Sequence, residues 1–120
     1  MTDAAYKFGY RAPRYRADFC FLLQTEERIP SLVDARCTDL SEGGLAAKTK
    51  ASLEIGANVV LIVTLPGVST SLRIAARVIN RQVDGYGFAF IFSSQQERSY
   101  LHDYLESRRP SMIRSPDLSE

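Results

Sequence analysis

The sequence has almost no excess of either sign of charge. Its 120 residues include 15 Lys and Arg against 14 Asp and Glu, which leaves a formal net charge of +1. Proteins that grip nucleic acid through its phosphates usually carry a strong basic excess. The composition therefore argues against a general nucleic-acid-binding protein, and we expect no nucleic acid polymer among its partners.

Metal-binding and catalytic motifs are also missing. The two cysteines, Cys20 and Cys37, form no CxxC pair, and the single histidine, His102, has no second ligand one helical turn away. We therefore expect no metal site. We expect His102 to be a surface or interface histidine. Both cysteines lie in alternating apolar stretches, which predicts buried, reduced thiols. Ser99, His102 and Asp103 fall within one predicted helix, where they cannot adopt triad geometry. Without a GxSxG, phosphate-loop or dinucleotide motif, we expect no enzyme activity and no cofactor.

Long apolar segments are missing as well. The run Val59–Val63 is far too short to span a bilayer, and the polar N-terminus has no apolar segment of the kind found in a secretory signal. We therefore expect a cytoplasmic protein that does not insert into a membrane.

What the chain does have is alternation of apolar and polar residues, as in strands with one buried face. Phe19, Phe21 and Leu23 show it clearly. Turn signals such as Pro66-Gly67 and Asp84-Gly85 separate the alternating stretches. Six strands are predicted, at residues 16–23, 33–38, 45–49, 58–65, 72–81 and 87–92.

The C-terminal part of the sequence changes to a helical period. Ser94 followed by Glu97 is a capping box, and Leu101, Tyr104 and Leu105 recur at helical spacing, which predicts a helix over residues 95–108. Six strands and one helix indicate a mainly β protein, a six-stranded antiparallel barrel whose open mouth the helix covers. The predicted organisation is a flexible arm at 1–13, the barrel with its closing helix at 14–109, and a disordered tail at 110–120.

Basic side chains gather at the N-terminus. Lys7, Arg11, Arg14 and Arg16 crowd the first 16 residues, with Asp3 the only acid among them. Short charge runs are usually solvated termini. The alternative is an anion-binding arm.

The segment Asp39–Gly44 (DLSEGG) follows the second predicted strand and fits the pattern D/N-x-S-x-x-G. Asp, Ser and Gly are common in any turn, so the pattern alone is weak. Its context adds weight, because an arginine-rich arm precedes it by about 25 residues and a hairpin with the sequence GYGFAF follows.

This arrangement resembles the PilZ domain family from about Tyr10 to Ser107. The resemblance implies a β-barrel that binds the bacterial second messenger cyclic di-GMP through R-x-x-x-R in the arm and D/N-x-S-x-x-G on the barrel. Arg14 stands at the second arginine, Tyr10 at the first, and Arg11 one position later. Gly87-Phe88 is similar to the family's last hairpin.

The chemistry of guanine suits the residues that the resemblance points to. A guanidinium matches the O6 and N7 acceptors of guanine, and arginine also stacks on bases and pairs with phosphate. A carboxylate such as Asp39 can accept from the N1–H and N2–H₂ donors on the opposite edge. Ser41 can bond a phosphate, a base edge or its own turn, and Gly44 permits positive φ or a close approach of the ligand. The implied ligand-binding residues are Tyr10, Arg11, Arg14, Asp39, Ser41 and Gly44.

Arg73, Arg77 and Arg81 lie on one face of the fifth predicted strand. A solvated strand face is the ordinary explanation. If this strand neighbours the ligand surface, Arg77 or Arg81 assists binding.

Three functions follow from these observations. The first is a cyclic di-GMP receptor whose arm becomes ordered on binding and which acts on a separate protein effector, as yet unidentified. The second is a degenerate PilZ domain that has lost the nucleotide and serves as a protein–protein adaptor. The third is a small barrel that binds single-stranded nucleic acid through its Arg/Tyr-rich arm.

Overall fold

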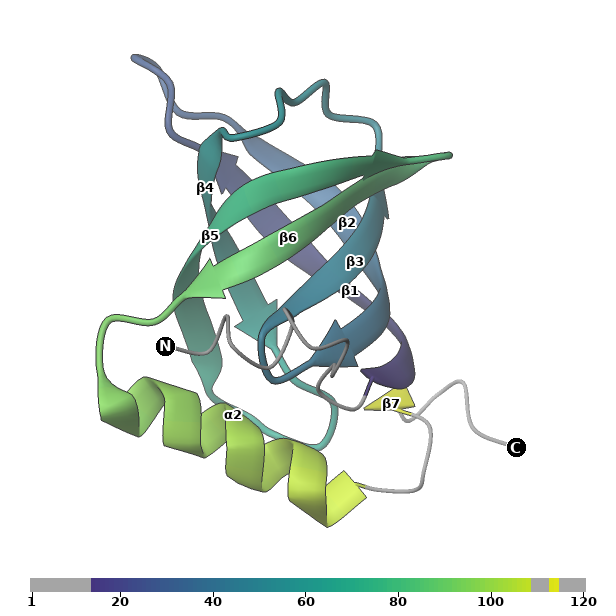
Figure 1. The fold of residues 1–120 in the computed structure, drawn as a ribbon, viewed down its shortest axis with the longest axis vertical. Helices are drawn as coiled ribbons and strands as arrows, with labels where there is room; N and C mark the ends of the chain where they lie inside the picture. Colours follow the sequence, from purple (N-terminus) through teal and green to yellow (C-terminus); the bar gives the residue numbers. More distant parts are fainter. Residues whose placement is uncertain (1–13, 109–112, 115–120) are drawn as a thin grey trace, which may run out of the picture.

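The computed structural model describes residues 14–108 and 113–114, and six of its strands close into an antiparallel barrel (Figure 1). The strands follow one another around the barrel in the order β1, β2, β3, β6, β5, β4, and β4 returns to β1. The elements are β1 (Arg14–Thr25), β2 (Leu32–Ser41), β3 (Gly44–Thr49), β4 (Asn58–Thr64), β5 (Ser71–Gln82), β6 (Gly85–Ile91), α2 (Gln95–Arg108) and β7 (Ile113–Arg114). The predicted fold class is confirmed.

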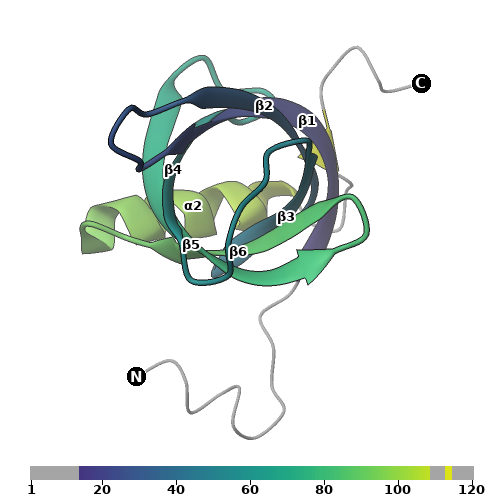
Figure 2. The same cartoon turned by 90° about the horizontal axis from the view of Figure 1, so that it is seen from above.

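The barrel forms because its strands alternate between inward apolar residues and outward polar ones. Phe19, Phe21 and Leu23 of β1 point inward, and Phe88 of β6 is 1% exposed. Each such side chain contributes about 1.5–3 kcal/mol through its burial. The predicted alternation is therefore what places the core inside the ring seen in Figure 2.

Helix α2 covers one end of the barrel, at the bottom of Figure 1. Its Leu101, Tyr104 and Leu105 belong to the buried core, and the Tyr104 hydroxyl donates to the carbonyl of Pro66 at 2.8 Å. The helix begins as the capping box predicts, because the Glu97 amide donates to Ser94 Oγ at 3.1 Å. The Glu97 carboxylate reaches one residue further back than expected and accepts from the amide of Ser93 at 2.8 Å.

The two cysteines differ in environment, and the prediction was wrong for one of them. Cys37 is fully buried, and this burial raises the pKa of its thiol to about 12. Cys20 is exposed. The reason is strand parity, since Cys20 lies between the inward-facing Phe19 and Phe21 and so points to the outside of the barrel.

The turn predicted over Asp39–Gly44 is shorter in the structure. Strand β2 continues to Ser41 and β3 begins at Gly44, so only residues 42 and 43 form the turn. The strand is prolonged because Leu40 is 2% exposed and keeps its place in the core. The β2–β3 register is irregular between Cys37 and Asp39. This irregularity changes which side of the sheet the following residues point to.

The predicted arm and most of the predicted tail lie outside the described residues. Within the tail, Ile113–Arg114 form the short strand β7, which pairs in parallel with Ala17 and Asp18 of β1. No helix in the described ranges is long and apolar enough to cross a membrane.

Candidate functional site

The motif residues lie on the outer wall of the barrel, at the end that α2 covers. Three strand ends meet there, namely the start of β1, the end of β2 and the start of β3. The register places Arg14 opposite Ser41 and Arg16 opposite Asp39. Segments that are distant in sequence are therefore brought side by side by strand pairing.

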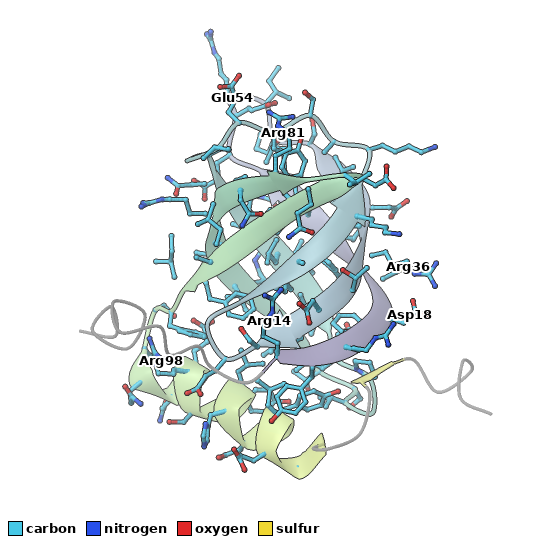
Figure 3. The ribbon with its side chains drawn as sticks, turned by 45° about the vertical axis from the view of Figure 1, so that its right-hand side comes forward. Arg14, Asp18, Arg36, Glu54, Arg81 and Arg98 are labelled. Carbon is cyan, nitrogen blue, oxygen red and sulfur yellow. The ribbon has the colours of Figure 1, made fainter. Side chains whose placement is uncertain are left out.

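Arg14 and Asp39 form an ion pair across β1 and β2. The two side chains are 44% and 26% exposed, so solvent and ligands can reach both groups. Figure 3 shows Arg14 on the lower part of the barrel wall. Two of the expected ligand-binding residues are thus in direct contact, whereas Tyr10 and Arg11 lie outside the described residues.

The Ser41 hydroxyl is engaged in its own turn. Its oxygen accepts from the Gly43 amide at 3.3 Å, and the hydroxyl donates to the Gly44 carbonyl at 3.2 Å. Of the roles that the sequence left open for this serine, the structure describes the bond to its own backbone.

Gly44 has a packing role that the sequence did not indicate. Among the described residues only Gly56 and Gly67 have positive φ, so Gly44 needs no left-handed conformation. A Cβ at Gly44 would instead overlap the backbone carbonyl of Phe88 on β6. The close approach that requires glycine is therefore made by the neighbouring strand. The adjoining bond from the Phe90 amide to the Gly43 carbonyl, at 2.9 Å, holds β6 against this turn.

Beside the ion pair, the outer face of β3 and β6 is built of small residues. The register places Gly44 opposite Ala89 and Ala46 opposite Gly87. Their sequence neighbours Leu45, Ala47 and Phe88 belong to the core, so these four small residues face outward. Gly44 and Ala89 are partly exposed, whereas Ala46 is only 5% exposed and Gly87 is buried against the Asn80 side chain. We call Gly44, Ala46, Gly87 and Ala89 the small-residue floor. The sequence signal for this floor is a small residue at every second position, in residues 44–46 (GLA) and 87–89 (GFA).

Strand β5 borders the far side of this floor. Arg77 pairs in register with Ala89, and Asn80 pairs with Gly87. Arg77 is exposed, and its Nε donates to the Asn58 side chain at 3.3 Å. Of the two arginines considered from the sequence, Arg77 therefore borders the floor. Arg81 lies at the other end of the barrel, 5.6 Å from the ring centroid of Tyr86 (Figure 3).

Helix α2 contacts the motif turn directly. His102 Nδ1 lies 3.3 Å from Glu42 Oε1, and both side chains are partly exposed. The sequence predicts a surface or interface histidine but does not identify Glu42 as its partner, because the two residues are far apart in the chain. No group of three or more His, Cys, Asp or Glu side chains in the described residues is arranged to hold a metal ion.

Comparisons with known proteins agree with the barrel fold. A sequence model described as PilZ domain matches residues 10–107. The PilZ domain of CeSA from a cellulose-synthesising bacterium superposes with a TM-score of 0.64 at 22% identity, covering 80% of this chain and 97% of that one. The PilZ domain of YcgR from Escherichia coli with c-di-GMP has a TM-score of 0.61 at 21% identity, over 81% and 88% of the two chains.

A structure of YcgR from Escherichia coli in complex with c-di-GMP also matches, with a TM-score of 0.62 at 23% identity. The match covers 81% of this chain but only 44% of that protein. The search of curated proteins found no significant match.

Proposed function

This chain belongs to the PilZ domain family, and on that premise we propose that it is a cytoplasmic receptor for cyclic di-GMP, a binding module and not an enzyme. The observation that carries the proposal is the exposed Arg14–Asp39 pair beside the small-residue floor. YcgR, whose PilZ domain shares this fold, is described in complex with c-di-GMP.

The two charged groups have complementary roles toward guanine. The Arg14 guanidinium can donate to O6 and N7, and the Asp39 carboxylate can accept from N1–H and N2–H₂. In the structure each group satisfies the other. Binding then exchanges an ion pair within the protein for two contacts with the ligand, so neither charge is left without a partner.

The floor gives a planar ligand a surface to lie on. Within the floor, Gly44 and Ala89 are partly exposed and have side chains of one carbon or none, so a ligand can approach the wall there, between Arg14 on one side and Arg77 on the other. We propose that residues 1–13 close over the ligand from above, with Tyr10 stacking on a base and Arg11 pairing with a phosphate or base edge. Ordering this arm changes the surface offered to a separate effector protein.

Tyr10 lowers the expected affinity. A bidentate arginine contact is worth about 1–3 kcal/mol, which corresponds to about 5- to 150-fold in the dissociation constant. Tyrosine provides stacking but no bidentate donor, and Arg11 recovers part of the loss from the next position. The expected dissociation constant is therefore higher than for a site with arginine at both motif positions.

Calorimetric titration with cyclic di-GMP tests the proposal. We expect micromolar binding by the wild-type protein and a loss of at least about tenfold in both Arg14→Ala and Asp39→Ala, as for removal of a charged hydrogen bond. Arg73→Ala is the matched control, because Arg73 is an exposed β5 arginine next to Gln24 and away from the floor. Absence of binding by the folded wild-type protein would overturn the receptor function.

The second candidate function is a protein–protein adaptor that has lost the nucleotide. It is favoured by the way the motif groups satisfy one another, since Arg14 bonds Asp39 and Ser41 bonds its own turn. The same titration separates the two functions, because an adaptor of this kind gives no heat with cyclic di-GMP while remaining folded.

A further inference from the structure

A concave region lies on the barrel wall toward the end that is remote from α2. It has a volume of about 840 Å³ and is lined by residues of β1, β2, β3 and the β5–β6 hairpin. Four of the lining residues are basic, and we call this region the basic hollow after them: Arg36, Lys48, Lys50 and Arg81. Figure 3 shows Arg81 at the opposite end of the barrel from Arg14.

The basic hollow is separate from the motif residues but lies on the same wall. On β3, Lys48 follows Gly44 by four residues, which corresponds to about 13 Å along a strand. A molecule in the hollow therefore does not have to contact the Arg14–Asp39 pair, although it would lie beside a ligand on the small-residue floor.

The positive charges in the hollow are not fully compensated. Arg36 and Lys48 are direct cross-strand partners, an arrangement that is destabilising for like charges. Asp18 neutralises Arg36, with an N–O distance of 2.5 Å. Across residues 14–107, neither Lys48 nor Lys50 has a carboxylate within 4.0 Å. A bound anionic group would supply the counter-charge that Lys48 and Lys50 lack.

Apolar and acidic groups in the hollow decide which kind of anion it fits. Val83 lines it with 97% of its surface exposed, and Val33 also lines it. Tyr86 is buried, with its hydroxyl accepting from the Leu53 amide at 2.9 Å, so its ring gives no exposed platform for stacking bases. Asp34 and Asp84 also line the hollow, and a continuous phosphate backbone would meet them at like charge.

We propose that the basic hollow is a docking site for an extended acidic segment of a partner protein, with Asp or Glu side chains on Lys48 and Lys50 and an aliphatic side chain against Val83. Complementary charge supplies specificity and speeds association, and the aliphatic contact with Val83 buries apolar surface. The proposal does not depend on nucleotide binding. It gives the chain a surface through which a partner is held.

Selection from a phage-displayed library of random twelve-residue peptides tests the proposal while the partner is still unidentified. Wild-type protein is expected to enrich peptides with several Asp or Glu residues and an aliphatic residue between them. One enriched peptide, synthesised with a fluorescein label, is then measured by anisotropy. The double variant Lys48→Glu/Lys50→Glu should bind it at least tenfold more weakly, and Arg73→Glu, which reverses a charge on β5 away from the hollow, should bind it within twofold of wild type. Thermal unfolding of each variant establishes that it is folded.

Cys20 locates the bound peptide, because it is exposed and lines the hollow, whereas Cys37 is buried. A saturating concentration of the peptide is expected to slow alkylation of Cys20 several-fold. Three outcomes would overturn the proposal: enrichment of no peptides or of neutral or basic ones, equal effects of the Lys48/Lys50 and Arg73 variants, or unchanged alkylation of Cys20. Tighter binding of a twelve-nucleotide single strand than of the peptide would also overturn it, in favour of nucleic acid.

Discussion

Arg14 pairs with Asp39, although the strand register places Arg14 opposite Ser41 and Asp39 opposite Arg16. The contact is therefore diagonal across β1 and β2, within reach of long side chains. It joins the arm motif to the barrel motif by a direct side-chain contact. Two groups that are expected to bind the same guanine are thereby held at one place on the barrel wall.

The first prediction is that the Arg14–Asp39 pair contributes little to stability. Both side chains are partly exposed, and pairs of this kind are worth about 0–1 kcal/mol. A double-mutant cycle of Arg14→Ala and Asp39→Ala, measured by urea unfolding without ligand, should give a coupling free energy below about 1 kcal/mol. A coupling above about 2 kcal/mol would assign the pair a structural role in place of a binding role.

The second prediction is that Arg77 contacts cyclic di-GMP from the far side of the floor. Arg77→Ala should weaken binding by about 10- to 150-fold, as expected for loss of one hydrogen bond to a charged group. Arg73→Ala, on the same strand, should leave the affinity unchanged. If both variants bind like the wild type while Arg14→Ala does not, the ligand does not extend across to β5.

The third prediction concerns Gly44. A methyl group there would overlap the Phe88 carbonyl, so Gly44→Ala should lower the free energy of unfolding by about 1–3 kcal/mol through overpacking. Chemical denaturation measures this directly. Ser69→Ala, at an exposed loop position, is the control and should be close to neutral. Unchanged stability of Gly44→Ala would show that β6 does not require the glycine.

The fourth prediction is a pH dependence that comes from Cys37. Its thiol has a pKa of about 12 in the folded protein against a reference value of 9.0, because burial disfavours the thiolate. Between these values the unfolded state has released a proton that the folded state retains. Stability therefore falls as the pH rises above about 9, by up to about 1.4 kcal/mol per pH unit.

Unfolding of wild type and Cys37→Ala between about pH 8 and pH 10.5 isolates this contribution. The variant is expected to be less stable at pH 8 because of the cavity, but its stability should fall less steeply with pH. Cys20→Ser, at the exposed cysteine, is the control for removing a thiol outside the core. Identical slopes for wild type and Cys37→Ala would contradict the prediction.

The fifth prediction concerns the start of α2. Ser94→Ala removes the acceptor of the Glu97 amide bond and should cost about 1 kcal/mol, because an N-cap hydroxyl is lost. The effect reaches the barrel, since Leu101 of the same helix is 1% exposed in the core. Ser99→Ala, at an exposed position within the helix, should not destabilise. Equal effects of the two substitutions would argue that the cap is not formed in solution.

The alternation of apolar residues was sufficient to predict the six strands, because one face of each strand has to be buried. The capping residues and the helical period were sufficient for α2. The prediction failed for Cys20, because its position in the alternation of β1 points its side chain to solvent. It also failed for the length of the motif turn, because the burial of Leu40 extends β2 and so shortens the turn. In both cases the outcome depends on which side of the strand faces the core. The amino-acid composition around a residue does not indicate that side.

The candidate site divides in the same way. The sequence by itself determined the residue types of the motif and the family they indicate, since Arg14, Asp39, Ser41 and Gly44 are local features of spacing. Only the tertiary structure decided which groups meet. The Arg14–Asp39 pair, the approach of Phe88 to Gly44 and the convergence of Lys48 with Arg36 all depend on strand register. Register is set by closure of the barrel, in which strands distant in sequence become neighbours, and no local pattern contains that information.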